Sequence, residues 1–133
     1  MTRPLRSIDV PGLAHNAPIP TGARVGNVIC TSAISGKDAA TGELPAAADA
    51  QAAHAFRNLA SVLAAGGGSV ADVVKLTIYV KDNSVREAIN AEWLQCFPNP
   101  EDRPARHIVV HDLQHGMLLQ LECLAVLAGA NQG

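Results

Sequence analysis

The period of the hydrophobic pattern changes in the middle of the chain, on either side of three consecutive glycines. Before them, in "AAADAQAAHAFRNLASVLAAGGG", apolar residues recur at the spacing of one helical face: Ala52, Phe56, Leu59 and Leu63. After them, from Val74 to Lys81, apolar and polar residues alternate as in a strand with one buried face. Glycine ends helices readily, because it adopts the left-handed conformation without a Cβ penalty. The pattern predicts an amphipathic helix followed by a half-buried strand.

A second helix is predicted in "NSVREAINAEWLQCF". Ser84 and Glu87 have the spacing of a capping box at its start. Pro98 and Pro100 end it, because proline lacks an amide donor and disfavours helix in the residue before it. The apolar residues of one helical face are Val85, Ile89, Trp93 and Cys96.

Strands are predicted on both sides of this central region. "ARVGNVICTSAISG" predicts a strand from Val25 to Ile34, entered by a hairpin with Gly26 and Asn27 as its turn. "DRPARHIVVHDLQHGMLLQLECLAVL" predicts two apolar strands around a polar turn. The order is strand, strand, helix, strand, helix, strand, strand. For 133 residues this predicts a single α+β domain over residues 1–133, a mixed sheet with two helices on one face.

Charge and composition argue against several classes of partner. The net charge is -2 and no block of like charges occurs, so neither a nucleic acid nor an anionic membrane is expected to bind. No apolar run is long enough to span a bilayer, and the start "MTRPLRSIDVPG" lacks the apolar centre of a signal peptide, so we expect a cytoplasmic protein. Cys30, Cys96 and Cys123 have no CxxC spacing and are expected to be reduced, packed thiols.

One charged residue stands in each of the last two predicted strands. If residues 112–116 form the turn of an antiparallel hairpin, Arg106 lies opposite Glu122, with Cβ atoms about 4.5–5.5 Å apart. The pair then has two interpretations. It is either a salt bridge that fixes the strand register, or a half-buried arginine that binds a substrate carboxylate beside a glutamate that positions water. A slip of one residue would put the two side chains on opposite faces.

Three histidines, His107, His111 and His115, follow closely after Arg106. In an extended strand His107 and His111 lie about 13 Å apart, too far to share one metal ion. Neither belongs to a helical HExxH pattern. We expect surface or interface histidines and no metal site.

Five segments, in order, resemble those of the RidA/YjgF family of enamine/imine deaminases: "VGNVICTSAIS", "TGELPA", "DVVKLTIYVKD", "RPARHIVVHDL" and "LLQLECLAV". The resemblance extends over residues 18–126. It implies a chorismate-mutase-like fold and a homotrimer with three sites in the clefts between subunits. It also implies hydrolysis of 2-aminoacrylate-like enamines and imines to 2-oxo acids and ammonia, without a cofactor.

Position by position, the resemblance implies that Arg106 binds the substrate carboxylate, that Glu122 lies near the attacking water, and that Ser32 lines the site. The chain departs from the family pattern at three expected pocket positions. A tyrosine of many members, the glycine after the serine, and a cysteine two positions after the arginine are replaced by Ile19, Ala33 and Ile108. These replacements predict a smaller, less polar pocket wall.

The uncovered face of the sheet is also expected to be apolar, with Thr77, Tyr79, Val109 and Leu121 on it, which predicts a closed three-fold oligomer. An alternative function remains open. The chain could form a non-catalytic trimer that binds small carboxylates through Arg106, or a module that protects other proteins. Turnover of freshly formed imino acids discriminates an enzyme from a binder.

Overall fold

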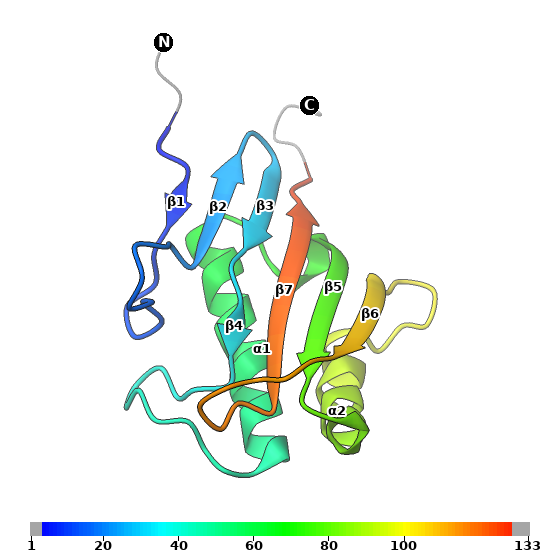
Figure 1. The fold of residues 1–133 in the computed structure, drawn as a ribbon. Coiled ribbons are helices and arrows are strands. Elements are labelled where there is room, and N and C mark those ends of the chain that lie inside the picture. Colours follow the sequence, from blue (N-terminus) through cyan, green and yellow to red (C-terminus); the bar gives the residue numbers. More distant parts are fainter. Residues whose placement is uncertain (1–3, 129–133) are drawn as a thin grey trace.

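The computed structural model describes residues 4–128, which form one sheet with two α-helices on one of its faces (Figure 1). The helices are α1 (Ala48–Ala65) and α2 (Arg86–Cys96), with short 3₁₀ turns η1 (Val70–Asp72) and η2 (Asn83–Val85). The strands are β1 (Ser7–Ile8), β2 (Gly22–Val25), β3 (Val28–Thr31), β4 (Ile34–Ser35), β5 (Val73–Val80), β6 (Ala105–Val110) and β7 (Leu119–Val126). The predicted α+β class and the two helices on one face are confirmed.

The strand order is β1-β2-β3-β7-β5-β6, and β4 also pairs with β7. All pairs are antiparallel except β5 and β6, which α2 joins in a crossover. The chain then passes across the end of β5, and β7 inserts between β3 and β5 (Figure 1). Because β5 separates β6 from β7, the predicted hairpin of these two strands is wrong.

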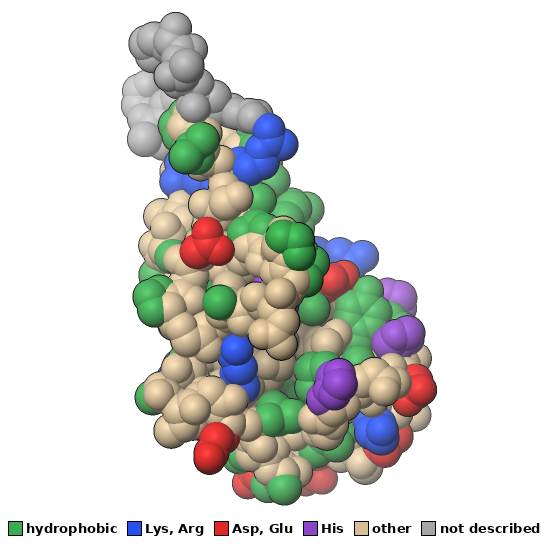
Figure 2. All heavy atoms as spheres, turned by 60° about the vertical axis from the view of Figure 1, so that its left-hand side comes forward, with side chains coloured by type: hydrophobic (Ala, Val, Ile, Leu, Met, Phe, Trp, Pro, Cys, Tyr) green, Lys and Arg blue, Asp and Glu red, His purple; other side chains and the backbone are tan. Residues whose placement is uncertain are grey.

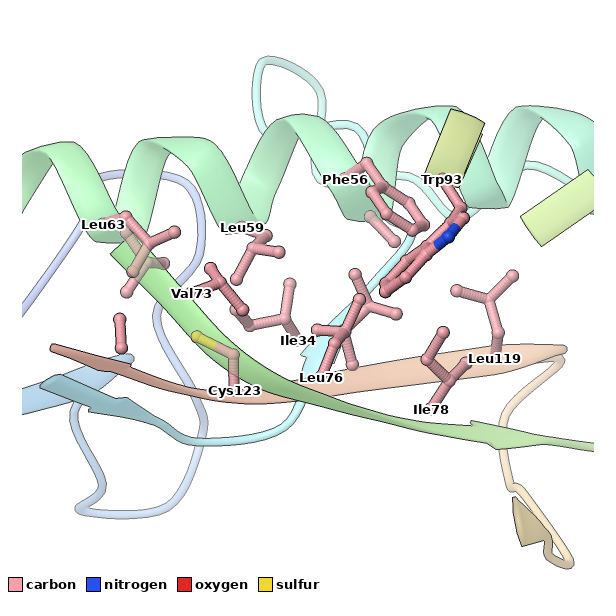
Figure 3. Close-up of a cluster of buried hydrophobic side chains, with 14 of the residues drawn as sticks. Ile34, Phe56, Leu59, Leu63, Val73, Leu76, Ile78, Trp93, Leu119 and Cys123 are labelled. Carbon is pink, nitrogen blue, oxygen red and sulfur yellow. The ribbon is translucent and has the colours of Figure 1, made fainter. Parts of the chain in front are cut away.

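The core lies between α1, α2 and one face of the sheet. Figure 3 shows Phe56, Leu59 and Leu63 of α1 pointing at side chains of the sheet. On β5 the side chains that face the helices are fully buried, namely Leu76, Ile78 and Val80. Burying such a side chain contributes about 1.5–3 kcal/mol, so this layer supplies much of the stability of the fold.

Two local predictions need correction. Val74 does not share the buried face of β5, because the register shifts between Val73 and Lys75 and leaves Val74 exposed, as in a β-bulge. The capping box predicted at Ser84 and Glu87 is also wrong. Asp82 accepts a hydrogen bond from the Ser84 amide and caps η2, so α2 begins only at Arg86.

Neither helix covers the other face of the sheet, which is the open face hereafter (Figure 1). Its apolar side chains in the β2, β3 and β7 region are 38–44% exposed: Val25, Val28, Leu124 and Val126. Leu121 was predicted here, but it lies on the covered face and is buried. Lys, Arg, Asp and Glu side chains are dispersed over the surface seen in Figure 2, without a continuous basic patch. Within residues 4–128 no helix is long and apolar enough to cross a bilayer.

Candidate functional site

Arg106 lies on β6, at the edge of the sheet. It stands beside Leu76 of β5, so its side chain is on the covered side, next to α2. Its Nη1 donates a 2.8 Å hydrogen bond to Asn90 Oδ1, and its guanidinium lies over the Trp93 ring, 4.9 Å from the ring centroid. Partial burial lowers the pKa of Arg106, and the nearby charge of Arg86 adds to this. One helix thus fixes a half-buried cation from two sides.

This cation has no carboxylate partner within residues 4–128. The cross-strand salt bridge with Glu122 is therefore wrong as an account of Arg106 in the single chain. A guanidinium has several N–H donors, and among the described residues Arg106 donates one hydrogen bond, to Asn90. Arg106 can still offer a planar pair of donors to the carboxylate of a small molecule.

Glu122 lies on β7, near the middle of the sheet, and faces the open side. It pairs with Thr77 of β5, which in turn pairs with His107 of β6. The Tyr79 hydroxyl donates a 3.0 Å hydrogen bond to Glu122 Oε1, which raises the pKa of Tyr79. The carboxylate lines a shallow hollow together with Cys30, Thr31, Lys75, Thr77, Cys123 and Leu124. A carboxylate held in this way can accept a hydrogen bond from water and act as a base.

Arg106 pairs with Leu76 of β5, and Glu122 pairs with the next residue of β5, Thr77. Successive side chains of a strand point to opposite faces, so the two charged groups lie on opposite sides of the sheet. They do not form one site within a single chain. The inferred register failed because β5 lies between the two strands, a long-range pairing that hydrophobic alternation does not reveal.

Ser32 and Ala33 interrupt the sheet between β3 and β4, where one continuous strand was predicted. The Ser32 hydroxyl donates a 2.8 Å hydrogen bond to the Pro20 carbonyl, which fixes this break. The Ala33 carbonyl lies 3.4 Å from Nε2 of His15. Ala33 also lines a cavity of about 190 Å³ with Leu13, His15, Ile34, Val62, Met117 and Gln120.

The two isoleucines of the predicted pocket wall lie far apart. Ile19 is 50% exposed and borders a separate shallow hollow beside His15. Ile108 packs against the core on the same side of β6 as Arg106. Ser32 and Ala33 thus lie at the break between β3 and β4, with Ile19 beside the Pro20 carbonyl that accepts the Ser32 hydrogen bond, whereas Arg106 and Ile108 lie on the edge strand β6.

Sequence reasoning missed Asn90, assigned Trp93 only to the core, and placed Tyr79 on the open face without connecting it to Glu122. A signal for Asn90 was available, because Asn90 and Trp93 lie three residues apart on one helical face. The contact of Tyr79 with Glu122 depends on the pairing of β5 with β7, which alternation alone does not reveal.

The histidines and cysteines occupy different environments. His107 is exposed, the ring of His111 meets that of Tyr79 edge to face at 5.9 Å, and His115 has a positive φ of 61° in the turn before Gly116. In the described part of the chain, no three His, Cys, Asp or Glu residues come together as metal ligands. All three cysteines are free, as predicted, but Cys30 is exposed rather than packed. Burial raises the pKa of Cys123 to about 12.

Known proteins resemble this chain over most of its length. The family described as endoribonuclease L-PSP matches residues 14–127. A RutC family protein of Haemophilus influenzae is 37% identical over 105 residues, which are 77% of this chain and 81% of that protein. The 2-iminobutanoate/2-iminopropanoate deaminase of Escherichia coli K12 is 34% identical over 111 residues, 82% of this chain and 87% of the deaminase.

Solved structures agree with this assignment. Escherichia coli TdcF with bound serine has a TM-score of 0.84 and 27% identity, covering 92% of this chain and 99% of TdcF. The YjgF gene product of Escherichia coli has a TM-score of 0.83 and 31% identity, covering 91% of this chain and 98% of that protein. The matched family, the identities and the shared fold together mean that the chain belongs to the endoribonuclease L-PSP family, the RidA/YjgF family predicted from its sequence.

Proposed function

We propose that this protein is an enamine/imine deaminase that hydrolyses 2-imino acids to 2-oxo acids and ammonia. The observation that carries the proposal is Arg106, a half-buried guanidinium held by Asn90 and Trp93 and without a carboxylate partner in the described chain. The likeness to a relative named 2-iminobutanoate/2-iminopropanoate deaminase supports the same activity. The binding of serine by the similar protein TdcF supports a substrate of amino-acid size.

The active site is shared between subunits of a homotrimer. Arg106 and Glu122 lie on opposite faces of one sheet, so a site that uses both needs Glu122 of the partner subunit. The exposed apolar side chains of the open face, such as Val28 and Leu124, support an oligomer that covers this face. A closed three-fold arrangement repeats the contact three times and forms three equivalent sites.

In this site the protein binds the substrate and delivers water. Arg106 binds the carboxylate of the imino acid through two hydrogen bonds and fixes the imine carbon in place. Glu122 of the partner subunit, held by Tyr79, accepts a hydrogen bond from a water molecule and takes its proton as the oxygen adds to the carbon. Glu122 returns this proton to the nitrogen of the carbinolamine, the C–N bond breaks, and ammonia leaves as Glu122 takes the hydroxyl proton and the carbonyl forms. An enamine substrate first takes up a proton at carbon to become the imine.

Ammonia release tests the activity directly. An amino-acid oxidase converts L-alanine to 2-iminopropanoate, and semicarbazide traps whatever imine remains. We expect the protein to accelerate ammonia release and to reduce the trapped fraction. Binding of pyruvate without any acceleration would instead identify the non-catalytic carboxylate binder.

Mixed trimers test the shared site. Arg106→Ala and Glu122→Gln are expected to be inactive alone, because each lacks one half of every site. When the two are unfolded and refolded together in equal amounts, about one quarter of the sites combine an intact Arg106 with an intact Glu122. We therefore expect recovery of about one quarter of the wild-type rate. No recovery in trimers of proven mixed composition would mean that both residues act from the same subunit, and activity in either single variant would mean that its residue is not required.

A further inference from the structure

Arg86 lies one helical turn before Asn90 in α2 and shares a helical face with Asn90 and Trp93, at i, i+4 and i+7. These two residues hold Arg106, so the helix places a second guanidinium beside the first. The proximity has an electrostatic effect, because the charge of Arg86 contributes to the lowered pKa of Arg106. Helix α2 thus presents two cations at the edge of the sheet.

Nothing in the described chain neutralises this pair. Arg86 Nε donates a 2.9 Å hydrogen bond to the neutral side chain of Asn83, and Arg106 bonds to the neutral side chain of Asn90. Neither arginine forms an ion pair within residues 4–128. Two neighbouring like charges repel each other, and this repulsion is relieved when anionic groups bind between or beside them.

We propose that Arg86 binds a second carboxylate, so that the preferred substrates are 2-imino dicarboxylic acids. This inference rests on the proposed function, in which Arg106 binds the carboxylate next to the imine. Arg86 is exposed and anchored through Nε, so its terminal nitrogens remain available to the far end of a short substrate. The shortest such substrate that derives from a protein amino acid is 2-iminosuccinate, in which one CH2 group separates the second carboxylate from the imine carbon.

The charge balance of the shared site favours this class of substrate. Two arginines and Glu122 of the partner subunit together carry one net positive charge. The reactive, protonated form of a monocarboxylic imino acid is neutral overall, whereas that of 2-iminosuccinate carries one negative charge. Of the two substrates, therefore, only the dicarboxylic one neutralises the site. Its electrostatic attraction to the site increases as water leaves the cleft, because the effective dielectric constant falls.

The test compares two imines in the wild type and in Arg86→Gln. 2-Iminosuccinate is made from L-aspartate by an aspartate oxidase, with oxygen reduced to hydrogen peroxide, and 2-iminopropanoate from L-alanine as above. We expect the wild type to prefer 2-iminosuccinate in kcat/KM. Arg86→Gln should lower kcat/KM for 2-iminosuccinate about 10-fold or more, because hydrogen bonds between charged groups are lost. The value of kcat/KM for 2-iminopropanoate should stay within about 2-fold of the wild type.

A matched control and a conservative variant complete the design. Arg57→Gln makes the same change of charge on α1, where the Arg57 side chain is exposed and lies within hydrogen-bonding distance of His54, so both substrates should keep their wild-type values. Arg86→Lys should restore part of the preference, because the charge returns without the planar fork. Binding of the 2-oxo acid products provides a readout without turnover. Calorimetry should show that Arg86→Gln raises the Kd for oxaloacetate about 10-fold and changes the Kd for pyruvate by no more than about 2-fold.

The outcomes separate this inference from the proposed function. Equal losses for both imines in Arg86→Gln, or no loss for either, would overturn the dicarboxylate specificity while hydrolysis by the wild type still supported the deaminase. Hydrolysis of neither imine by the wild type would overturn both conclusions.

Discussion

The two halves of the proposed site are built in opposite ways. Arg106 lies on an edge strand, on the covered side of the sheet, and one helix holds it with a hydrogen bond and a ring contact. Glu122 lies on an inner strand, on the open face, and one tyrosine hydroxyl holds it. The group proposed to bind the substrate is thus fixed by the same layer that stabilises the fold. The group proposed to activate water lies on the face that the proposed partner subunit covers.

Substitution of Arg106 should have the largest effect on kcat/KM. We expect Arg106→Ala to lower kcat/KM for imino acids about 10³-fold, or about 4 kcal/mol, because a desolvated charge-assisted contact is lost. Arg106→Lys should lose about 10²-fold, since lysine lacks the planar fork. The ammonia-release assay measures both, after light scattering has established a trimer. A folded Arg106→Ala trimer with activity within a few-fold of the wild type would contradict the mechanism.

Substitutions on the covered and open faces of β5 should differ in their effect on the free energy of unfolding, and this difference is the next largest that we expect. Ile78→Ala removes a fully buried side chain, and we expect the free energy of unfolding to fall by about 2–5 kcal/mol. Lys75→Ala changes an exposed side chain on the open face and should cost about 0.5 kcal/mol or less. Urea unfolding at one fixed protein concentration measures both values. Equal losses would mean that the open face carries as much of the stability as the core.

Burial of Cys123 on the covered face can be tested through the pH dependence of the free energy of unfolding. Its pKa in the folded chain is raised to about 12 from an ordinary value of about 9, so the unfolded chain loses this proton first. The stability that the neutral thiol contributes is complete below pH 9 and falls as the pH rises toward 12. Between pH 8 and pH 10 the wild type should lose about 1.4 kcal/mol more than Cys123→Ala. Parallel curves for the two proteins would show that the thiol ionises equally in both states.

Tyr79 allows the Glu122 half to be tested with the smallest change. Tyr79→Phe removes only the hydroxyl that bonds to Glu122. We expect kcat to fall about 5-fold, about 1 kcal/mol, because the carboxylate loses its fixed orientation. KM should stay within about 2-fold, since Arg106 still binds the substrate. A change in KM alone would indicate that Tyr79 contacts the substrate instead of positioning Glu122.

What the sequence reveals depends on how local the cause is. The helical period of α1, the glycines that end it and the alternation along β5 are local, and they predict these elements correctly. The place of β7 is not local, because inserting it between β3 and β5 depends on packing of the whole sheet. That one long-range pairing moved Leu121 to the core and separated Arg106 from Glu122. The residues of the proposed site were predicted from residue type and family resemblance, whereas the face of the sheet on which each one lies depends on the register.

The position of β6 at the edge of the sheet has a further consequence for solubility. An edge strand presents unpaired amides and carbonyls that can pair with another molecule and start aggregation. From Ile108 to Val110 this strand is wholly aliphatic, and Val110 is exposed. Charged side chains on edge strands discourage such pairing, so we expect Arg106 to oppose aggregation in addition to its proposed role in substrate binding. Loss of this cation is therefore expected to lower colloidal stability as well as the proposed turnover.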